Sequence, residues 1–359
     1  MRRVLQGLAG ADAAFATPGW FRSPARRPPA PACPREVLVL SPGAVPTTDF
    51  YISSRAAIVP GGLRVIDTSR ALPGEPPEPG ARLVLVRQAP QPWLQWVARH
   101  ADAFSRICYL MDDDMPAALA SRERPVGYAW RTARRHRDVA RLLAGVCDEF
   151  WLSTPELLAR YPGPRSLLCE PLPPVSSVDA AMQPEESVYF YHGTRAHMDE
   201  IRWLVPVVAR VQQMAPDAVF EIFGDARVAR LFAAVPRVRV RPWMNWPDYQ
   251  RYRSEHRFRV GLAPCLDTPF NRARAPVKFF DITRMGAAGV YADLAPYAGI
   301  VRHGQTGLLC AQREGDWVEA ILGLLADPNR YPDMAAAARE ACEAHRRSHL
   351  VWPGVADGR

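Results

Sequence analysis

The stretch PVKFFDITRMGAAGVYAD, residues 276–293, contains a helix pattern followed by a strand pattern, and this alternation continues through most of the chain. Pro276 suits the first turn of a helix, residues 278–285 can continue the helix, and Gly286 can end it because glycine accepts a positive φ. Residues 290–292 are apolar and predict a short buried strand. Helices and strands that alternate along a chain indicate an α/β fold with a parallel sheet.

Lys278 and Asp281 in this stretch lie three residues apart, so a helix places both side chains on one face. The helix dipole disfavours a cation in the first turn by about 0.3–1 kcal/mol, so the position of Lys278 makes more sense if an anion also binds there. A ligand with a phosphate and a sugar hydroxyl would suit the lysine and the carboxylate in turn. An ordinary surface ion pair is the alternative interpretation.

The composition limits the classes of protein to be considered. The 359 residues are 48% hydrophobic and 23% charged, which indicates a soluble globular protein with a large core and two domains. The seven cysteines are odd in number and show no CxxC spacing, which disfavours a disulfide framework or structural zinc site and favours a reducing cytoplasm. No apolar run reaches the roughly 18 residues of a membrane span and no signal peptide is evident, so neither membrane insertion nor export is expected.

The chain divides into four regions. Residues 1–35 are rich in arginine, proline and alanine and predict a flexible extension. Strand and helix patterns alternate in residues 36–180 and, after the proline-containing stretch 171–187, again in residues 186–330, while residues 331–359 predict a C-terminal helix and tail. The strands are expected at 36–40, 63–67, 82–86, 106–111, 149–153, 166–170, 188–194, 219–224, 238–243 and 259–264. Two such domains predict a cleft, because parallel sheets bind ligands outside the carboxyl ends of their strands.

Two strand ends carry residues that suit ligand binding. In YHGTRAHMDEI, residues 191–201, Gly193 and Thr194 lie where a strand gives way to a helix, and the free N–H groups there suit phosphate oxygens. In YLMDDDMP, residues 109–116, three consecutive aspartates follow a strand and suit either a metal ion or the hydroxyl groups of an acceptor. The structural alternatives are a capped strand-to-helix turn and a solvated acidic turn.

Residues 121–141 form a strongly basic segment, with seven arginines against two acidic residues. Together with the net charge of +8 and the isoelectric point near 9.3, the segment suggests an acidic partner such as an anionic membrane surface. No stretch resembles an RNA- or DNA-binding module, so nucleic acid is not expected as a partner. A solvated helix face is the alternative.

The motifs follow one another in an order that resembles a known family. The order is HGTRAH, FEIFGD, VGLAPCLDTPFN, VKFFDITRMGAAG and HGQTGLL, within residues 192–309. It resembles the C-terminal domain of the GT-B glycosyltransferases of retaining family 4, the group 1 transferases, over about residues 188–347. The N-terminal half is similar in strand order and in the aspartate turn. The resemblance implies an α/β fold of two Rossmann-like, doubly wound parallel-sheet domains that face a cleft.

The resemblance also implies how a nucleotide sugar is bound. The C-terminal domain would hold most of this donor, usually without a metal ion, and no cofactor is expected. Asp281 matches the acidic residue that grips the ribose, although the family usually has glutamate, and Gly286 matches the glycine of the turn that follows. Lys278 is expected to hold the diphosphate, helped by the N–H groups around Gly193 and Thr194.

The remaining candidate residues come from the same resemblance. His197, Gly224 and Asn271 lie in the matching motifs and are expected to take part in binding the nucleotide. Asp112 and Asp113 occupy a turn at which many members carry a histidine facing the reacting sugar, and they are expected to act in the transfer together with Lys278.

The sequence departs from the family pattern at three positions. Ala273 stands where many members have a glutamate eight residues before the second acidic residue, Thr194 stands where an arginine is common, and Ala288 replaces a proline. These departures leave the identity of the nucleotide open. They also permit a degenerate, inactive relative.

The expected function is transfer of a sugar, with retention, from a nucleoside diphosphate sugar to a hydroxyl of a glycan, lipid-linked or other acceptor. Assembly of surface polysaccharide or other glycans is the expected setting, in the cytoplasm, with peripheral contact at the inner face of the membrane. Three alternatives stay open: a sugar-nucleotide epimerase of the same fold, a degenerate non-catalytic assembly partner at the membrane surface, and a metal-dependent transferase that uses the aspartate turn.

Overall fold

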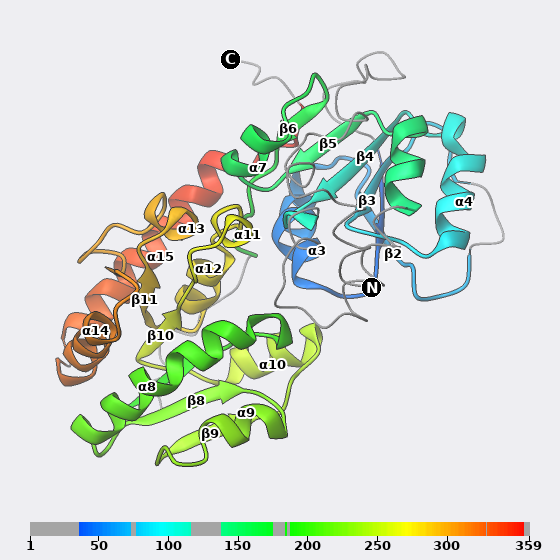
Figure 1. Ribbon diagram of the computed structural model, residues 1–359. Helices are drawn as coiled ribbons and strands as arrows, with labels where there is room; N and C mark the ends of the chain where they lie inside the picture. Colours follow the sequence, from blue (N-terminus) through cyan, green and yellow to red (C-terminus); the bar gives the residue numbers. More distant parts are fainter. Residues whose placement is uncertain are drawn as a thin grey trace. The chain divides into compact units, whose positions relative to one another are not determined.

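The computed structural model describes residues 36–72, 77–115, 138–174, 184, 187–327 and 329–354 (Figure 1). These residues fall into two compact units. Unit 1 comprises the described residues of 36–174 together with Ala273–Ala275 and residues 349–354, and unit 2 comprises the others. The predicted extension 1–35 and most of the arginine-rich segment 121–141 lie outside the described residues.

Unit 1 contains a sheet of six parallel strands in the order β2-β1-β3-β4-β5-β6. The strands are β1 (Val37–Ser41), β2 (Leu63–Asp67), β3 (Arg82–Val86), β4 (Arg106–Met111), β5 (Glu149–Leu152) and β6 (Ser166–Leu168). Every residue of β1, β3, β4 and β5 is buried, as expected for strands that are covered on both faces. The predicted strands of this half are therefore confirmed.

Short helices connect the strands of unit 1. They are α3 (Pro46–Tyr51), η2 (Ser53–Ile58), α4 (Gln91–Arg99), η3 (Ala101–Ala103) and α7 (Pro155–Arg160), and residues 138–146 are also helical. The Thr154 side chain caps α7 by accepting a hydrogen bond from the backbone N–H of Leu157. The C-terminal residues join this unit, since Trp352 packs edge-on against Trp151 with the ring centroids 5.2 Å apart.

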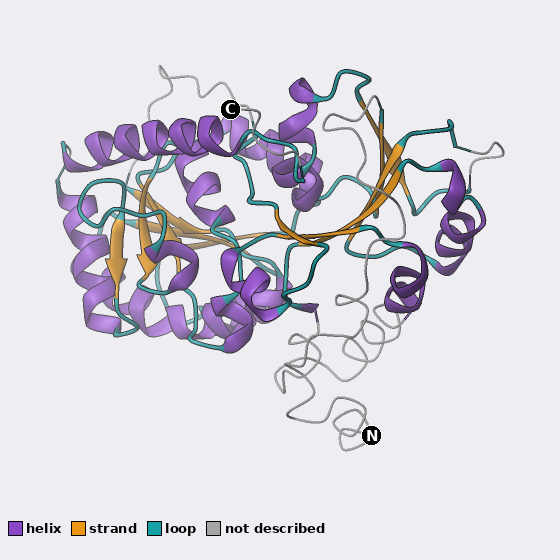
Figure 2. Ribbon diagram, turned by 90° about the horizontal axis from the view of Figure 1, so that it is seen from above, coloured by secondary structure: helices purple, strands orange, loops and turns teal. Residues whose placement is uncertain are grey.

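Unit 2 contains a second sheet of six parallel strands, in the order β12-β11-β10-β7-β8-β9. The strands are β7 (Val188–Tyr191), β8 (Val219–Phe223), β9 (Val238–Arg241), β10 (Val260–Ala263), β11 (Ala288–Ala292) and β12 (Leu308–Cys310). Figure 2 shows this sheet between two layers of helices. Each unit thus has the doubly wound, Rossmann-like architecture that the sequence predicts.

The helices of unit 2 include the helix expected from the stretch 276–293. They are η4 (Arg195–His197), α8 (Met198–Met214), α9 (Ala226–Leu231), α10 (Trp246–Glu255), α11 (Pro269–Arg272), α12 (Val277–Arg284), α13 (Ala295–Ala298), α14 (Glu314–Ala326) and α15 (Arg330–His349). In α12, Pro276 is the residue before the first turn, and Gly286 follows the helix with φ +73°. Helix α14 packs against α8, where the rings of Trp203 and Trp317 lie 5.2 Å apart.

The strand order marks where ligands bind in sheets of this kind. In unit 1 the chain reverses its direction of winding between β1 and β3, and in unit 2 between β7 and β10. Open parallel sheets bind ligands at the carboxyl ends of the two strands that flank such a switch point. The ends of β1, β3, β7 and β10 are therefore the first places to look for function.

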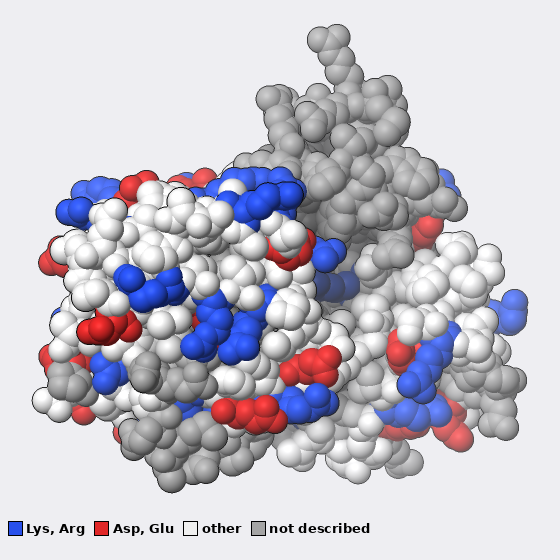
Figure 3. Space-filling view, turned by 90° about the horizontal axis from the view of Figure 1, so that it is seen from below, with Lys and Arg blue, Asp and Glu red and all other residues white. Residues whose placement is uncertain are grey.

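Two surface features bear on the expected partners. No helix within the described residues combines the length and the apolar content needed to cross a membrane. On the face shown in Figure 3, groups of basic side chains are interspersed with groups of acidic ones. Since most of residues 121–141 lies outside the described part of the chain, the predicted membrane contact stays a prediction.

Candidate functional site

The switch point of unit 2 is formed by the chain that leaves β7. Gly193 packs on the neighbouring Tyr191 ring so closely that a Cβ atom added there would lie 2.7 Å from Tyr191 Cε1. Thr194 precedes η4, and its hydroxyl accepts a hydrogen bond from the backbone N–H of Ala196 at 3.4 Å. Close packing therefore explains the glycine, and helix capping explains the threonine. Both structural alternatives to phosphate binding are thus present in this turn.

Lys278 is directed at this turn from the first turn of α12. Its Nζ donates a hydrogen bond to the carbonyl oxygen of His192 at 2.8 Å, and it lies 4.8 Å from the centroid of the Tyr191 ring. A carbonyl and an aromatic face attract an ammonium group without cancelling its charge. The His192 carbonyl and the Tyr191 ring thus hold the Lys278 ammonium group in place at the switch point.

Asp281 lies one turn further along α12 and is less accessible than the sequence suggests. Only 21% of its side chain is exposed, and its Oδ1 lies 3.6 Å from Nη1 of Arg284. Burial raises the pKa of Asp281, while Arg284 and Lys278 act to lower it. Since Oδ1 faces Arg284, Oδ2 is the oxygen better placed for a ligand hydroxyl.

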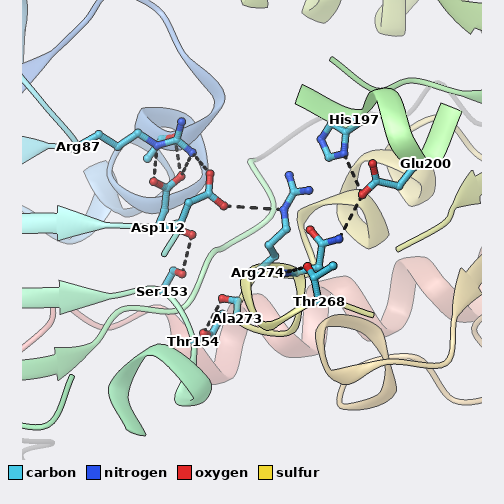
Figure 4. Close-up of polar contacts among 12 residues, drawn as sticks. Arg87, Asp112, Ser153, Thr154, His197, Glu200, Thr268, Ala273 and Arg274 are labelled. Carbon is cyan, nitrogen blue, oxygen red and sulfur yellow. Dashed lines mark hydrogen bonds and ion pairs between the residues drawn. The ribbon is translucent and has the colours of Figure 1, made fainter. Parts of the chain in front are cut away.

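His197 and Asn271 meet at a buried carboxylate that sequence reasoning missed. His197 Nδ1 and Asn271 Nδ2 lie 3.8 Å and 3.4 Å from the same oxygen, Oε1 of Glu200 in the first turn of α8 (Figure 4). Asn271 is held in turn by Thr268, whose hydroxyl accepts from the Asn271 backbone N–H at 3.1 Å. Two predicted binding residues are therefore brought together, and Glu200 joins them.

Two of the predicted glycines have clear packing reasons. A Cβ atom at Gly224 would lie 2.4 Å from Cβ of Val228, so β8 and α9 can approach only because this residue is glycine. Gly286 has a positive φ at the end of α12 and lies beside the Arg257 side chain. Neither glycine requires a ligand to explain it.

The aspartate turn of unit 1 is occupied by hydrogen bonds from the protein itself. Asp112 is 7% exposed and accepts from the Thr47 hydroxyl at 2.7 Å and from both Nε and Nη2 of Arg87 (Figure 4). Asp114 is completely buried and accepts from Arg160 at 2.8 Å and from the Tyr161 hydroxyl at 2.6 Å. These two carboxylates stabilise the turn and have little capacity left for a ligand.

Asp113 differs from its neighbours because 22% of its side chain is exposed. Its oxygens lie 2.9 Å from Nη2 of Arg87 and 3.8 Å from Nε of Arg274. Arg87 follows β3 at the switch point of unit 1 with φ +57°, a left-handed conformation that costs a side-chain-bearing residue about 1–2 kcal/mol. Asp112 and Asp113 raise the pKa of Arg87 against the opposing effect of burial, so the guanidinium stays charged between them.

The segment Ala273–Ala275 belongs to unit 1, although the residues on either side of it belong to unit 2. Ala273 is completely buried in the core of unit 1, and its carbonyl accepts a hydrogen bond from the Thr154 hydroxyl at 3.0 Å. The sequence resemblance leads to the expectation of a glutamate at Ala273. A glutamate here would have to enter an apolar core, which gives a physical reason for the alanine.

The structure adds four candidate residues that the sequence did not predict: Arg87, His192, Glu200 and Arg274. Arg87 and His192 directly follow the strands RLVLV and VYFY. This position could have identified them from the sequence, because polar residues at the carboxyl ends of parallel strands are candidates for ligand contact. Within the described residues, no group of three or more histidine, cysteine, aspartate or glutamate side chains is arranged to hold a metal ion. The charges of Asp112 and Asp113 face arginines.

A family comparison finds a match within unit 2. Residues 186–327 match the family described as Glycosyl transferases group 1. The match covers less than half of the chain, and we refer to residues 186–327 as the group 1 domain because of this similarity. The group 1 domain contains the turn of Gly193 and Thr194 after β7, which we call the β7 turn, and it contains Asn271 and α12. It therefore contains every candidate residue of unit 2. Among curated proteins, no sequence matches the chain.

Solved structures share the fold of this chain. The chain resembles HepE of Anabaena, solved with UDP-glucose, at 11% identity over 88% of this chain and 98% of that one, with a TM-score of 0.56. It resembles the sucrose-phosphate synthase of Thermosynechococcus elongatus at 14% identity over 86% and 94%, with a TM-score of 0.52. The chain has the GT-B fold, with the group 1 domain as its second half.

A third similar structure is longer than this chain. The chain resembles TarM of S. aureus, solved with fondaparinux, alpha-GlcNAc-glycerol and UDP, at 11% identity and a TM-score of 0.52. The match covers 75% of this chain and 55% of TarM, so the chain spans about half the length of that relative. At such identities the likeness concerns the fold.

Proposed function

We propose that this protein is a glycosyltransferase that moves a sugar from a nucleoside diphosphate sugar to an acceptor hydroxyl. The observation that carries the proposal is the Lys278 ammonium group, which bonds the His192 carbonyl at the switch point of the group 1 domain. The ammonium group would bind the diphosphate together with backbone N–H groups near Gly193 and Thr194. Oδ2 of Asp281 would accept a hydrogen bond from a ribose hydroxyl.

The chemical role of Lys278 follows from the charge that develops during transfer. As the bond between the sugar and the diphosphate breaks, negative charge grows on the leaving oxygen, and a cation that is already in place stabilises it. The resemblance to the retaining transferases supports retention of the anomeric configuration. We expect no metal ion to be needed, because Lys278 would supply the positive charge.

Asp113 is the carboxylate of unit 1 that we assign to the acceptor. Asp112 and Asp114 accept hydrogen bonds from neighbouring side chains and are nearly or fully buried, whereas Asp113 is partly exposed. Arg87 Nη1 makes no hydrogen bond within the part of the chain that the structure describes, so it can donate to a ligand. A carboxylate next to a guanidinium suits a neutral hydroxyl group, which donates to the first and accepts from the second.

The acceptor class is proposed from the same chemistry. Asp112 and Asp113 lie beside the guanidinium groups of Arg87 and Arg274. Charges that balance in this way favour a neutral polyol over an anion or a metal ion. We therefore propose a glycan or another hydroxyl-bearing acceptor, with glycan assembly as the setting. The carbohydrate ligands named in the structure of TarM are consistent with this class.

A thermal-shift experiment tests the donor site. The purified protein is heated with UDP, GDP, ADP or dTDP at a concentration of about 100 times Kd, at which one bound ligand adds about 2.7 kcal/mol to the free energy of unfolding. We expect one of these nucleotides to raise the melting temperature, with or without EDTA. If none of the four does so, the protein does not bind a nucleotide donor and the proposed function is wrong.

A further inference from the structure

His192, which follows β7, has a ring that is buried among aromatic side chains. Only 4% of its side chain is exposed. The ring lies 4.3 Å from the centroid of Phe190 and 4.4 Å from that of Phe223. A histidine in such surroundings has lost nearly all contact with water, so its two nitrogen atoms need partners within the protein.

Both nitrogen atoms of His192 have such partners. Nε2 lies 3.4 Å from Oε1 of Glu221, and Nδ1 lies 3.5 Å from the hydroxyl oxygen of Tyr249. Burial lowers the pKa of His192 to about 4, against the opposing effect of Glu221, so the ring is neutral at neutral pH. A neutral ring has one donor and one acceptor, so Nε2–H donates to Glu221 and Nδ1 accepts from Tyr249.

Glu221 anchors this arrangement from the middle of β8. The residue is completely buried and accepts hydrogen bonds from the Tyr252 hydroxyl, from Nη1 of Arg239 at 3.3 Å and from Nε of Arg241 at 3.2 Å. Burial raises its pKa, but the hydrogen bonds from His192 and Tyr252 outweigh this effect and lower the pKa to about 2. Glu221 is therefore a charged acceptor, fixed by the sheet, with which His192 is aligned.

His192 connects this anchor to both residues assigned to the donor. Its carbonyl oxygen accepts the hydrogen bond from Lys278, and its ring contacts Tyr249. Tyr249 lies close enough to Asp281 for the charge of that carboxylate to raise the pKa of the phenol, after the larger effect of burial. A rotation of the His192 ring would disturb the tyrosine beside Asp281, and a change in its backbone would move the acceptor of Lys278.

We propose that His192 is a positioning residue for the diphosphate: its ring, held by Glu221 and Tyr249, fixes the main-chain carbonyl that holds the Lys278 ammonium. The inference rests on the proposed function, because it assigns to Lys278 the binding of a nucleoside diphosphate. His192 does not touch the donor. It acts through Lys278, so its effect must depend on the presence of that lysine.

The test compares His192→Phe with the unaltered protein. Phenylalanine keeps an aromatic ring of similar size but offers neither hydrogen bond. Calorimetry measures the affinity for whichever of UDP, GDP, ADP and dTDP binds, and ligand-observed NMR measures the affinity for the corresponding nucleoside. We expect the variant to bind the diphosphate about 10-fold more weakly, a change of about 1.4 kcal/mol, and the nucleoside with unchanged affinity.

Three further variants separate positioning from general damage. In a Lys278→Ala background, His192→Phe is expected to change diphosphate affinity less than about twofold, because the residue through which it acts is gone. His192→Gln, whose carboxamide keeps a donor and an acceptor, should restore part of the affinity. His256→Phe is the matched control, because this histidine stacks on Tyr252 with the ring centroids 3.9 Å apart and hydrogen-bonds the Tyr252 carbonyl, whereas the carbonyl that Lys278 bonds belongs to His192. The diphosphate affinity of this control should be unchanged.

The outcomes distinguish this inference from the proposed function. If no nucleotide binds the unaltered protein, the proposed function fails and this inference fails with it. If a nucleotide binds but His192→Phe weakens diphosphate and nucleoside equally, or has the same effect with and without Lys278, then His192 is only structural. If His192→Phe does not fold, Tyr249→Phe replaces it, with an expected loss of about threefold for the diphosphate alone.

Discussion

The carboxyl edges of the two sheets hold their charged residues in different ways. In unit 1, Asp112 and Asp114 are buried and accept hydrogen bonds from arginines, so each charge is matched within the protein. In unit 2, Lys278 is held by a carbonyl and an aromatic ring. The first arrangement stabilises a turn, and we propose that the second serves an anionic ligand.

The difference indicates which charged residues near the carboxyl edge of a sheet are candidates for ligand binding. The three consecutive aspartates are the more conspicuous sequence feature, yet two of the three serve the fold. A single lysine in a helix is less conspicuous, yet a carbonyl and an aromatic ring hold its ammonium group at the switch point. Mutations in the two places should therefore have different consequences, for stability in unit 1 and for binding in unit 2.

The largest expected effect is on stability in unit 1. Asp114→Ala removes the buried carboxylate that pairs with Arg160, whose side chain is only 16% exposed, and should lower the free energy of unfolding by about 4 kcal/mol. Asp113→Ala, at a partly exposed position, should cost less than about 1 kcal/mol. Urea unfolding followed by tryptophan fluorescence measures both values. Equal losses at the two positions would contradict the distinction between them.

The next effect concerns pH and the buried histidine of unit 2. Between about pH 4, the pKa of folded His192, and the ordinary value of 6.5, the unfolded chain binds a proton that the folded protein does not. The free energy of unfolding should therefore fall as the pH is lowered from 6.5 towards 4, with His192 contributing about 3 kcal/mol. Urea unfolding at several pH values should show a shallower fall for His192→Phe than for the unaltered protein. Identical pH profiles would mean that His192 does not titrate as its burial requires.

Lys278→Ala should affect binding and leave stability nearly unchanged. Loss of a charge-assisted contact with the diphosphate should weaken nucleotide binding by about 2 kcal/mol, or about 30-fold, as measured by calorimetry. Arg272→Ala is the control, because this exposed cation lies six residues earlier and pairs with Asp267 at 2.8 Å. If the control weakens binding as much as Lys278→Ala does, a general loss of positive charge explains both results.

The smallest expected effect is a difference in stability between two variants of Arg87, the strained arginine in unit 1. Arg87→Gly and Arg87→Ala both remove the guanidinium, but only glycine adopts φ +57° without strain. The glycine variant should therefore be more stable than the alanine variant by about 1 kcal/mol in urea unfolding. An alanine variant as stable as the glycine variant would show that the left-handed conformation relaxes once the arginine is removed.

The sequence predicts the two sheets well for a physical reason. Strands such as RLVLV in β3 and RICYLM in β4 are nearly continuous apolar runs, because helices cover both faces of a parallel sheet. The helix α12 is equally predictable, since Pro276 and Gly286 mark its two ends. These elements are specified by neighbouring residues, which is the information that a single sequence contains.

The sites are less predictable because contacts between distant residues decide them. Arg87 meets Asp112 and Asp113 only after β3 and β4 have paired. The addition of Ala273–Ala275 to unit 1 depends on a core built more than 100 residues earlier in the chain. The hydrogen bond from Lys278 is accepted by the backbone carbonyl of His192. Every residue has such a carbonyl, so the type of residue at position 192 does not indicate this contact.

Hydrogen–deuterium exchange with and without the nucleotide that binds tests the central claim most directly. If Lys278 and the β7 turn form the diphosphate site, the nucleotide should slow exchange in peptides covering residues 191–199 and 276–285, and Lys278→Ala should abolish most of this protection at the same nucleotide concentration. Protection confined to peptides of unit 1, or protection of the two segments that persists in the Lys278→Ala variant, would contradict the account.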